Sequence, residues 1–171
     1  MIDANGAYSP KLAIGLARQF FDSAVTWFEE PVPYDDLEGL HTVRDKVPME
    51  VAAGEYGFGP RDFQSLLPVV DVLQADATRC QGITGFLRAA DLALEAQKPI
   101  SSHCAPTIHS HLGAAVRNFL HLEWFHDHVR IERLFFEGFI EPQAGALIPS
   151  SSLPGLGISL KRANMEPFRV A

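Results

Sequence analysis

The stretch that decides the fold is residues 25–55, VTWFEEPVPYDDLEGLHTVRDKVPMEVAAGE. It begins with a β-branched and aromatic run that Pro31 ends, a composition typical of a buried strand. Residues 35–47 start with an Asp cap and predict a helix. The apolar run MEVAAGE, residues 49–55, predicts a second strand. A strand, a helix and a strand in succession form a β-α-β unit, so the two strands are expected to be parallel.

The same alternation continues on both sides of this unit. Upstream, Ser9 and Pro10 predict the cap and first position of a helix. Downstream, strands are expected at 70–76, 98–103 and 119–125, and helices at 60–70, 84–97 and 107–118. After about residue 126 the rhythm stops, and the Gly-, Pro- and Ser-rich residues 141–162 predict an irregular tail. The strands are apolar almost throughout, so both a doubly wound sheet and a (β/α)8 barrel fit this α/β pattern.

Composition narrows the class of protein. The chain has 171 residues, enough for one domain with a core. Its 14 basic and 21 acidic residues give a net charge of −7, which argues against nucleic acid or an anionic membrane as partner. Cys80 and Cys104 stand at no metal-ligand spacing, so they predict small packing residues in a reducing compartment. With no secretory signal and no long apolar run, the expected location is the cytoplasm, with no membrane partner.

A side chain able to do chemistry stands at the carboxyl end of each expected strand. These residues are Asp3, Glu29 with Glu30, Glu55, Asp76, His103 and Glu123. Parallel strands point the same way, so these ends are expected to gather at one mouth, where ligands bind in barrels and open α/β sheets alike. Helix capping explains any one of these residues, but it is a poor explanation for all six positions.

The spacing of the carboxylates indicates a cation. The same interval of 26 residues separates Asp3 from Glu29 and Glu29 from Glu55, one β-α step each time. Three converging carboxylates repel one another unless a cation binds them, and hard oxygen ligands favour Mg²⁺. Asp76 and His103 again lie one step apart, where a carboxylate can fix the tautomer of an imidazole and raise its basicity.

Several motifs together resemble the enolase superfamily, and within it the mandelate racemase/muconate lactonizing enzyme family, mandelate racemase-like group. They are DANGAY (3–8), WFEEPV (27–32), AAGEYGFGP (52–60), LQADATRCQGITG (73–85), SSHCAPTIHSHL (101–112), HLEWF (121–125) and LPGLGISL (153–160). The set runs in the family's order and covers essentially the whole chain. No single motif is decisive, but the ordered set is highly specific.

The resemblance implies a role for each matching residue. The residues that match Mg²⁺ ligands are Asp3, Glu29 and Glu55, with Glu30 behind them. His103 with Asp76 matches the general acid/base pair, and Glu123 matches the residue that hydrogen-bonds the substrate carboxylate. Asn5 matches a position near the substrate, and Tyr56, beside Glu55, is expected to line the substrate pocket.

The implied reaction removes a proton α to a carboxylate through an enediolate. A His base suits racemisation or acid-sugar dehydration, and dehydration is favoured because it is common in the group. The substrate would be a small carboxylate or an acid sugar. Two alternatives stay open: a truncated, non-catalytic remnant or oligomerising fragment, and a muconate-cycloisomerase-like lactonising enzyme, which would want Lys where this chain has Asp76 and His103.

The implied fold is a partial (β/α)8 TIM-like barrel that holds about strands 3 to 8. Residues 1–140 would form the incomplete barrel, and residues 141–171 an irregular C-terminal segment packing on it. Family members also have an N-terminal capping domain and two further barrel strands, the second carrying a Lys base. We therefore expect catalysis to require a missing N-terminal half, another subunit or a homo-oligomer.

Some residues near the expected mouth leave their roles open. Arg79 fits a contact with a substrate carboxylate and a surface salt bridge equally well. Residues 126–128, His-Asp-His, favour a loop or subunit contact over a second metal site. His109 and His111 face different sides of a helix, so neither is expected to be a ligand.

Overall fold

The computed structural model describes residues 1–170, which contain a six-stranded parallel sheet. Its strands lie side by side in chain order: β1 (Ile2–Asp3), β2 (Trp27–Glu29), β3 (Glu50–Ala53), β4 (Val72–Ala75), β5 (Ile100–Ser102) and β6 (Phe119–Leu122). Every neighbouring pair is parallel, so all six carboxyl ends lie at one edge of the sheet. The expected strands are therefore confirmed.

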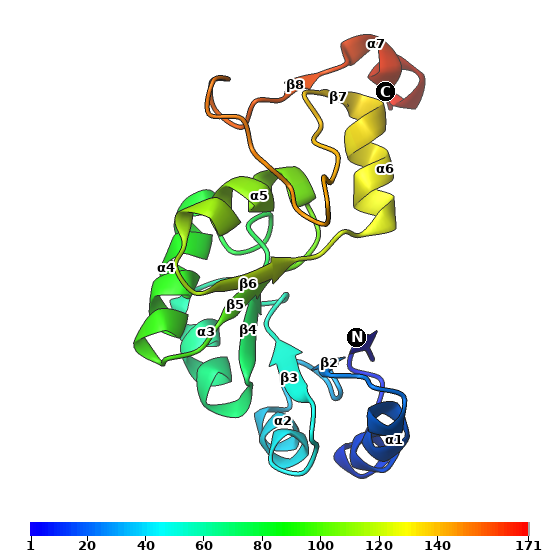
Figure 1. The fold of residues 1–171 in the computed structure, drawn as a ribbon, viewed down its shortest axis with the longest axis vertical. Helices are drawn as coiled ribbons and strands as arrows, with labels where there is room; N and C mark the ends of the chain where they lie inside the picture. The colour runs from blue at the N-terminus through cyan, green and yellow to red at the C-terminus, as the bar shows by residue number, and fades with distance from the viewer. Residues whose placement is uncertain (171) are drawn as a thin grey trace.

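Helices follow one side of the curled sheet, as Figure 1 shows. They are α1 (Pro10–Asp22), α2 (Leu37–Arg44), α3 (Pro60–Leu66), α4 (Gly82–Glu95) and α5 (Pro106–Ala115), and a 3₁₀ turn, η1 (Leu67–Val69), continues from α3. The caps explain where two of them begin: the Ser9 side chain accepts the Leu12 N–H, and the Asp36 side chain accepts the Gly39 N–H. Each capping oxygen satisfies an N–H that the first helical turn leaves free.

The core has two parts, one on each face of the sheet. The larger cluster lies between the sheet and the helices and includes Phe28, Leu73 and Phe86. The smaller consists of Trp27, Ala52 and Val72. Neighbouring residues of a strand face opposite sides, so Phe28 packs under the helices while Trp27 packs on the other face. The sheet thus forms a half-barrel, which confirms the partial TIM-like fold.

The C-terminal part is more regular than its sequence predicts. The β-α rhythm was expected to stop near residue 126, but helix α6 (His126–Phe135) begins there. An antiparallel pair follows, β7 (Phe136–Glu137) with β8 (Ser159–Leu160), then α7 (Arg162–Met165) and a 3₁₀ turn, η2 (Glu166–Phe168). Of the expected irregular stretch 141–162, residues 141–158 form no helix or strand, and the expectation is wrong only at β8, which pairs with β7, and at the start of α7. The division at residue 140 remains a prediction.

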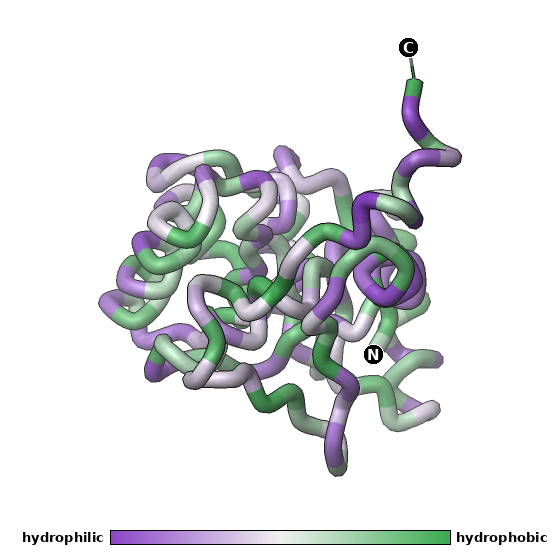
Figure 2. Tube along the Cα trace, turned by 90° about the horizontal axis from the view of Figure 1, so that it is seen from above, coloured by the Kyte–Doolittle hydropathy of each residue, from purple (hydrophilic) through white to green (hydrophobic). Residues whose placement is uncertain are grey.

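The final described residues extend from the rest of the chain, as Figure 2 shows. Phe168 and Val170 are exposed there. In the described part of the chain, every helix is too short or too polar to cross a bilayer.

Candidate active site

The chemistry-bearing residues lie at the carboxyl edge of the half-barrel. Glu29 ends β2, and Glu30 follows it directly. Asp76, His103 and Glu123 are the first residues after β4, β5 and β6. The edge gathers them because β4 pairs with β5, and β5 with β6, in nearly level register.

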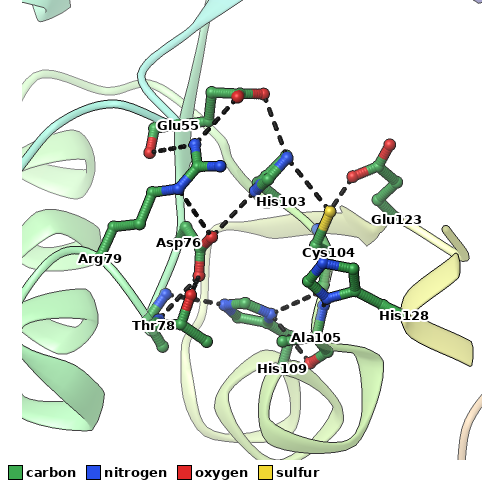
Figure 3. Close-up of polar contacts among 11 residues, drawn as sticks. Glu55, Asp76, Thr78, Arg79, His103, Cys104, Ala105, His109, Glu123 and His128 are labelled. Atoms are coloured by element: carbon green, nitrogen blue, oxygen red, sulfur yellow. Dashed lines mark hydrogen bonds and ion pairs between the residues drawn. The ribbon is translucent and has the colours of Figure 1, made fainter. Parts of the chain in front are cut away.

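His103 and Asp76 form a hydrogen-bonded pair. The His103 Nδ1 lies 2.9 Å from Asp76 Oδ2, and the second oxygen, Oδ1, accepts both the N–H and the hydroxyl of Thr78. Burial raises the pKa of Asp76, but the hydrogen bonds from His103 and Thr78 outweigh it and lower the pKa overall. Burial lowers the pKa of His103, yet the hydrogen bond to Asp76 and the charge of Glu55 leave it raised. The expected pair is thus in contact (Figure 3).

Glu55 contacts both this pair and the positively charged side chain of Arg79. Its Oε2 lies 3.3 Å from His103 Nε2, and its Oε1 lies 2.9 Å from Arg79 Nη1. The Arg79 Nε also lies 3.6 Å from Asp76 Oδ2, so one guanidinium bridges two carboxylates, as Figure 3 shows. The guanidinium stacks on the Tyr56 ring, 4.8 Å from its centroid. The sequence left open whether Arg79 contacts a substrate or forms a surface salt bridge. In the structure it contacts Glu55, Asp76 and Tyr56.

Glu29 and Glu30 are buried carboxyl groups beside these residues. Burial raises the pKa of Glu29 to about 7, although hydrogen bonds from Trp27 and Gln74 oppose the change. Burial, followed by the charges of Glu55, Asp3 and Glu29, raises the pKa of Glu30 to about 8. The Trp27 indole N–H holds Glu29 Oε2 at 2.8 Å. Glu30 Oε1 is buried without a hydrogen-bond partner.

This carboxylate group fits a divalent cation chemically. A cation would offset the mutual repulsion and the burial that raise these pKa values. The structure does not bring Asp3, Glu29 and Glu55 within mutual ligand distance. Asp3 accepts the Asn5 N–H at 2.7 Å and is exposed, while Glu55 is occupied by Arg79 and His103.

Glu123 and Cys104 form a contact that sequence reasoning missed. The Cys104 backbone N–H donates to Glu123 Oε2 at 2.9 Å, and the Cys104 thiol lies 3.1 Å from His103 Nε2. In the described chain, His103, Cys104 and Glu123 form the one group of three potential ligand residues with atoms all within 4.8 Å. The sequence signal was weak, because a lone Cys after a strand is most often a packing residue.

His109 holds the loop behind the site. Its buried ring accepts the Ala77 N–H at Nε2, 3.0 Å away, and its Nδ1 lies 2.8 Å from the Cys104 carbonyl oxygen. One ring therefore connects the loop after β4 to the loop after β5. The spacing of His109 in the sequence did not indicate this structural role, and the expectation that it is no ligand remains a prediction.

A model of the enolase C-terminal domain-like family matches residues 1–164. The chain belongs to the enolase C-terminal domain-like family. The expected resemblance to the mandelate racemase/muconate lactonizing enzymes of the enolase superfamily is confirmed.

Three relatives illustrate the family. A mandelate racemase/muconate lactonizing enzyme-like protein from Rubrobacter xylanophilus superposes with a TM-score of 0.94 and 46% identity, over 98% of this chain and 47% of that one. The L-talarate/galactarate dehydratase of Salmonella typhimurium is 33% identical over 72% of this chain and 32% of its own length. A Bradyrhizobium enolase, solved with magnesium and mandelic acid, gives a TM-score of 0.89 at 27% identity, over 99% of this chain and 46% of that one.

This enolase C-terminal domain-like chain thus spans less than half the length of these three relatives. Its relatives include acid-sugar dehydratases and epimerases, and structural neighbours have been crystallised with magnesium. The magnesium expectation is therefore supported for the family. The roles of individual site residues in this chain remain predictions.

Proposed function

We propose that this chain carries the metal-binding and proton-transfer residues for Mg²⁺-dependent removal of a proton α to a carboxylate. The substrate class is an acid sugar or another small carboxylate, and the reaction is dehydration or racemisation. One observation carries the proposal: the His103 ring lies between Asp76, 2.9 Å from Nδ1, and Glu55, 3.3 Å from Nε2. A single imidazole thereby connects the proton-transfer pair to a candidate metal ligand.

His103 is the proposed base. With Nδ1–H donated to Asp76, the lone pair is on Nε2, which takes the α-proton. The raised pKa of His103 favours proton uptake. In a dehydration, the protonated ring then returns the proton to the departing β-hydroxyl as water, and the enol product tautomerises to a 2-keto-3-deoxy acid. In a racemisation, the proton returns to carbon.

The carboxylates would stabilise the charge that forms. Asp3, Glu29 and Glu55 would hold the cation, and Mg²⁺ bound there would supply a Lewis acid for the substrate carboxylate. Glu123 accepts the Cys104 N–H on Oε2, which leaves Oε1 to face the substrate carboxylate. Asn5 and Tyr56 stand after β1 and β3 on the same edge, where they would contact the substrate.

Two alternatives remain. One is a non-catalytic remnant or oligomerising fragment, which would bind metal but turn nothing over. A muconate-cycloisomerase-like lactonising reaction is weaker, because Asp76 and His103 form a hydrogen-bonded acid/base pair at the positions where that reaction would want Lys.

The test is exchange of the α-proton. A panel of acid sugars and mandelate in D₂O with Mg²⁺, followed by proton NMR, detects exchange, and the same spectra reveal keto products of dehydration. Exchange by the unchanged chain, with a loss of about 10²–10⁴-fold in His103→Asn, would support the proposal. His126→Asn, which removes an exposed His outside the site, is the control and should leave the rate unchanged. A chain that binds Mg²⁺ but exchanges no proton would support the non-catalytic alternative.

A further inference from the structure

The thiol of Cys104 lies beside the proposed base, His103, and has no role in the proposed removal of the α-proton. Cys104 Sγ lies 3.1 Å from His103 Nε2, and the candidate ligand atoms of His103, Cys104 and Glu123 all lie within 4.8 Å of one another. A tetrahedral ion with bonds of about 2.0–2.3 Å holds its ligand atoms about 3.3–3.8 Å apart. The 3.1 Å between Cys104 Sγ and His103 Nε2 is close to this range, and a Glu123 oxygen lies within 4.8 Å of both residues' ligand atoms.

The backbone holds Cys104 in this place. Cys104 and Ala105 have φ values of 51° and 38°, a left-handed conformation that is unfavourable for residues with a side chain. The surrounding residues hold both peptide groups: His109 faces the Cys104 carbonyl, and His128 accepts the Ala105 N–H. Such strain persists where neighbours enforce it. Figure 3 shows the thiol between His103 and Glu123.

The hydrogen bond at His103 Nδ1 favours metal binding at Nε2. This Nδ1 is bonded to Asp76, and a carboxylate behind an imidazole orients the free nitrogen and makes it a better metal donor. The other oxygen of Asp76, Oδ1, accepts both the N–H and the hydroxyl of Thr78, so the carboxylate is held in place.

We propose that His103, Cys104 and Glu123 form a second metal site, for a thiophilic divalent cation of the Zn²⁺ class. Imidazole, thiolate and carboxylate together suit Zn²⁺, whereas Mg²⁺ takes oxygen ligands. Three protein ligands leave a fourth position for water or a substrate oxygen. Burial and the charge of Glu123 raise the pKa of the Cys104 thiol, so ion binding displaces its proton to solvent.

An ion bound at this second site would affect the reaction, an inference that rests on the proposed function. An ion at this site takes the Nε2 lone pair of His103, the atom that would accept the α-proton. Zn²⁺ would therefore inhibit exchange even with Mg²⁺ in excess.

The test uses Co²⁺ as a spectroscopic probe and Zn²⁺ in calorimetry. The unchanged chain should give a thiolate-to-cobalt charge-transfer absorption and bind one Zn²⁺ in competition with Co²⁺. Cys104→Ala should lose the absorption and at least about tenfold in Zn²⁺ affinity. Cys80→Ala is the matched control, because Cys80 is also buried but packs in the main core, and it should behave like the unchanged chain.

Absence of the charge-transfer absorption in the unchanged chain would overturn the proposal, whether or not Cys104→Ala folds. Equal Zn²⁺ affinity in Cys104→Ala would also overturn it. Glu29→Gln separates the two metal sites: it should weaken Mg²⁺ binding and keep the cobalt absorption. In the unchanged chain, a cobalt absorption without Mg²⁺ binding would count against the proposed function, and Mg²⁺ binding without the absorption would count against this second site.

Discussion

The Glu55 carboxylate contacts a permanently charged side chain, Arg79, and the proposed base, His103. Its Oε1 pairs with Arg79 and its Oε2 faces His103, so a cation that binds Glu55 has to compete with a guanidinium. The pair is mostly buried on the Glu55 side, where charges interact more strongly than at the surface. Arg79 thereby balances charge within a cluster of carboxylates.

His109 yields a prediction about pH and stability. Its Nε2 accepts an N–H, so a second proton there would break that bond, and burial lowers the pKa of the ring. The unfolded chain therefore binds more protons than the folded chain below about pH 6.5, and the free energy of unfolding falls as pH drops through that value. Urea unfolding of the unchanged chain and His109→Gln at pH 5 to 8 measures this.

We expect the unchanged chain to lose more stability toward pH 5 than His109→Gln does. His41→Gln, at an exposed helix position, is the control and should keep the pH dependence of the unchanged chain. Parallel curves for His109→Gln and the unchanged chain would contradict the account.

The sequence predicted the site residues that follow strands, but it did not predict the side chains from other loops and helices that contact them. Asp76 and His103 were identified because each stands at a strand end one β-α step from the other. Arg79 and His109 act across 24 and 32 residues of chain, and no local spacing indicates those contacts. Their roles follow from how the loops pack, which a pattern along the chain does not encode.

The backbone after β3 turns at Gly54 in a conformation that only glycine adopts readily. The φ of Gly54 is +135°, and a Cβ there would lie 2.2 Å from the Gln74 carbonyl oxygen of β4. Gly54→Ala should therefore displace the loop that carries Glu55 and lower the free energy of unfolding by about 1–3 kcal/mol. Urea unfolding measures the change.

Gly15 is the matched control for that substitution. It lies within α1, where a Cβ would meet nothing within 4 Å. Gly15→Ala should raise stability by about 0.5–1 kcal/mol, because Ala loses less freedom than Gly in a helix. Similar effects of the two substitutions would refute the role assigned to Gly54.

Helix α5 begins without a side-chain cap of its own, and α6 provides one. Glu132 of α6 accepts the hydroxyl of Thr107 at 2.5 Å and faces its N–H at 3.3 Å. A carboxylate at a helix N-terminus also interacts favourably with the helix dipole. Glu132→Ala should lower the free energy of unfolding by about 1–2 kcal/mol, as measured in urea.

Glu141→Ala is the control for this cap. Glu141 pairs with Arg133 at the surface, where ion pairs contribute little, and its loss should change stability much less. A smaller effect of Glu132→Ala than of Glu141→Ala would show that α6 does not support α5.

The sequence predicted the six strands and the first helices but not α6. Strands and caps have strong local signals, such as the apolar run before Pro31 and the Ser9 cap. Helix α6 has no side-chain cap, and Val129 is its one buried residue, so its apolar signal is weak. It forms where His128 and Glu132 contact the start of α5, a tertiary effect.

At the scale of the whole molecule, the sheet curls into half a barrel and leaves β1 and β6 each paired on one side. Strands in that position are prone to pair with another chain. The expected homo-oligomer or missing N-terminal half therefore remains a prediction. The carboxyl edge is nevertheless assembled within these residues, because β2 to β6 carry Glu29, Glu55, Asp76, His103 and Glu123 to one side.

The most direct measurement is a thermal melt with and without millimolar Mg²⁺, on the unchanged chain, Glu55→Gln and the surface control Glu141→Gln. An ion that binds the folded state alone stabilises it by about 2.7 kcal/mol at a hundred times its Kd. The account predicts that Mg²⁺ raises the Tm of the unchanged chain and of Glu141→Gln, and that Glu55→Gln loses this rise. No rise in any of the three, or the same rise in all three, would contradict a magnesium site at this edge of the sheet.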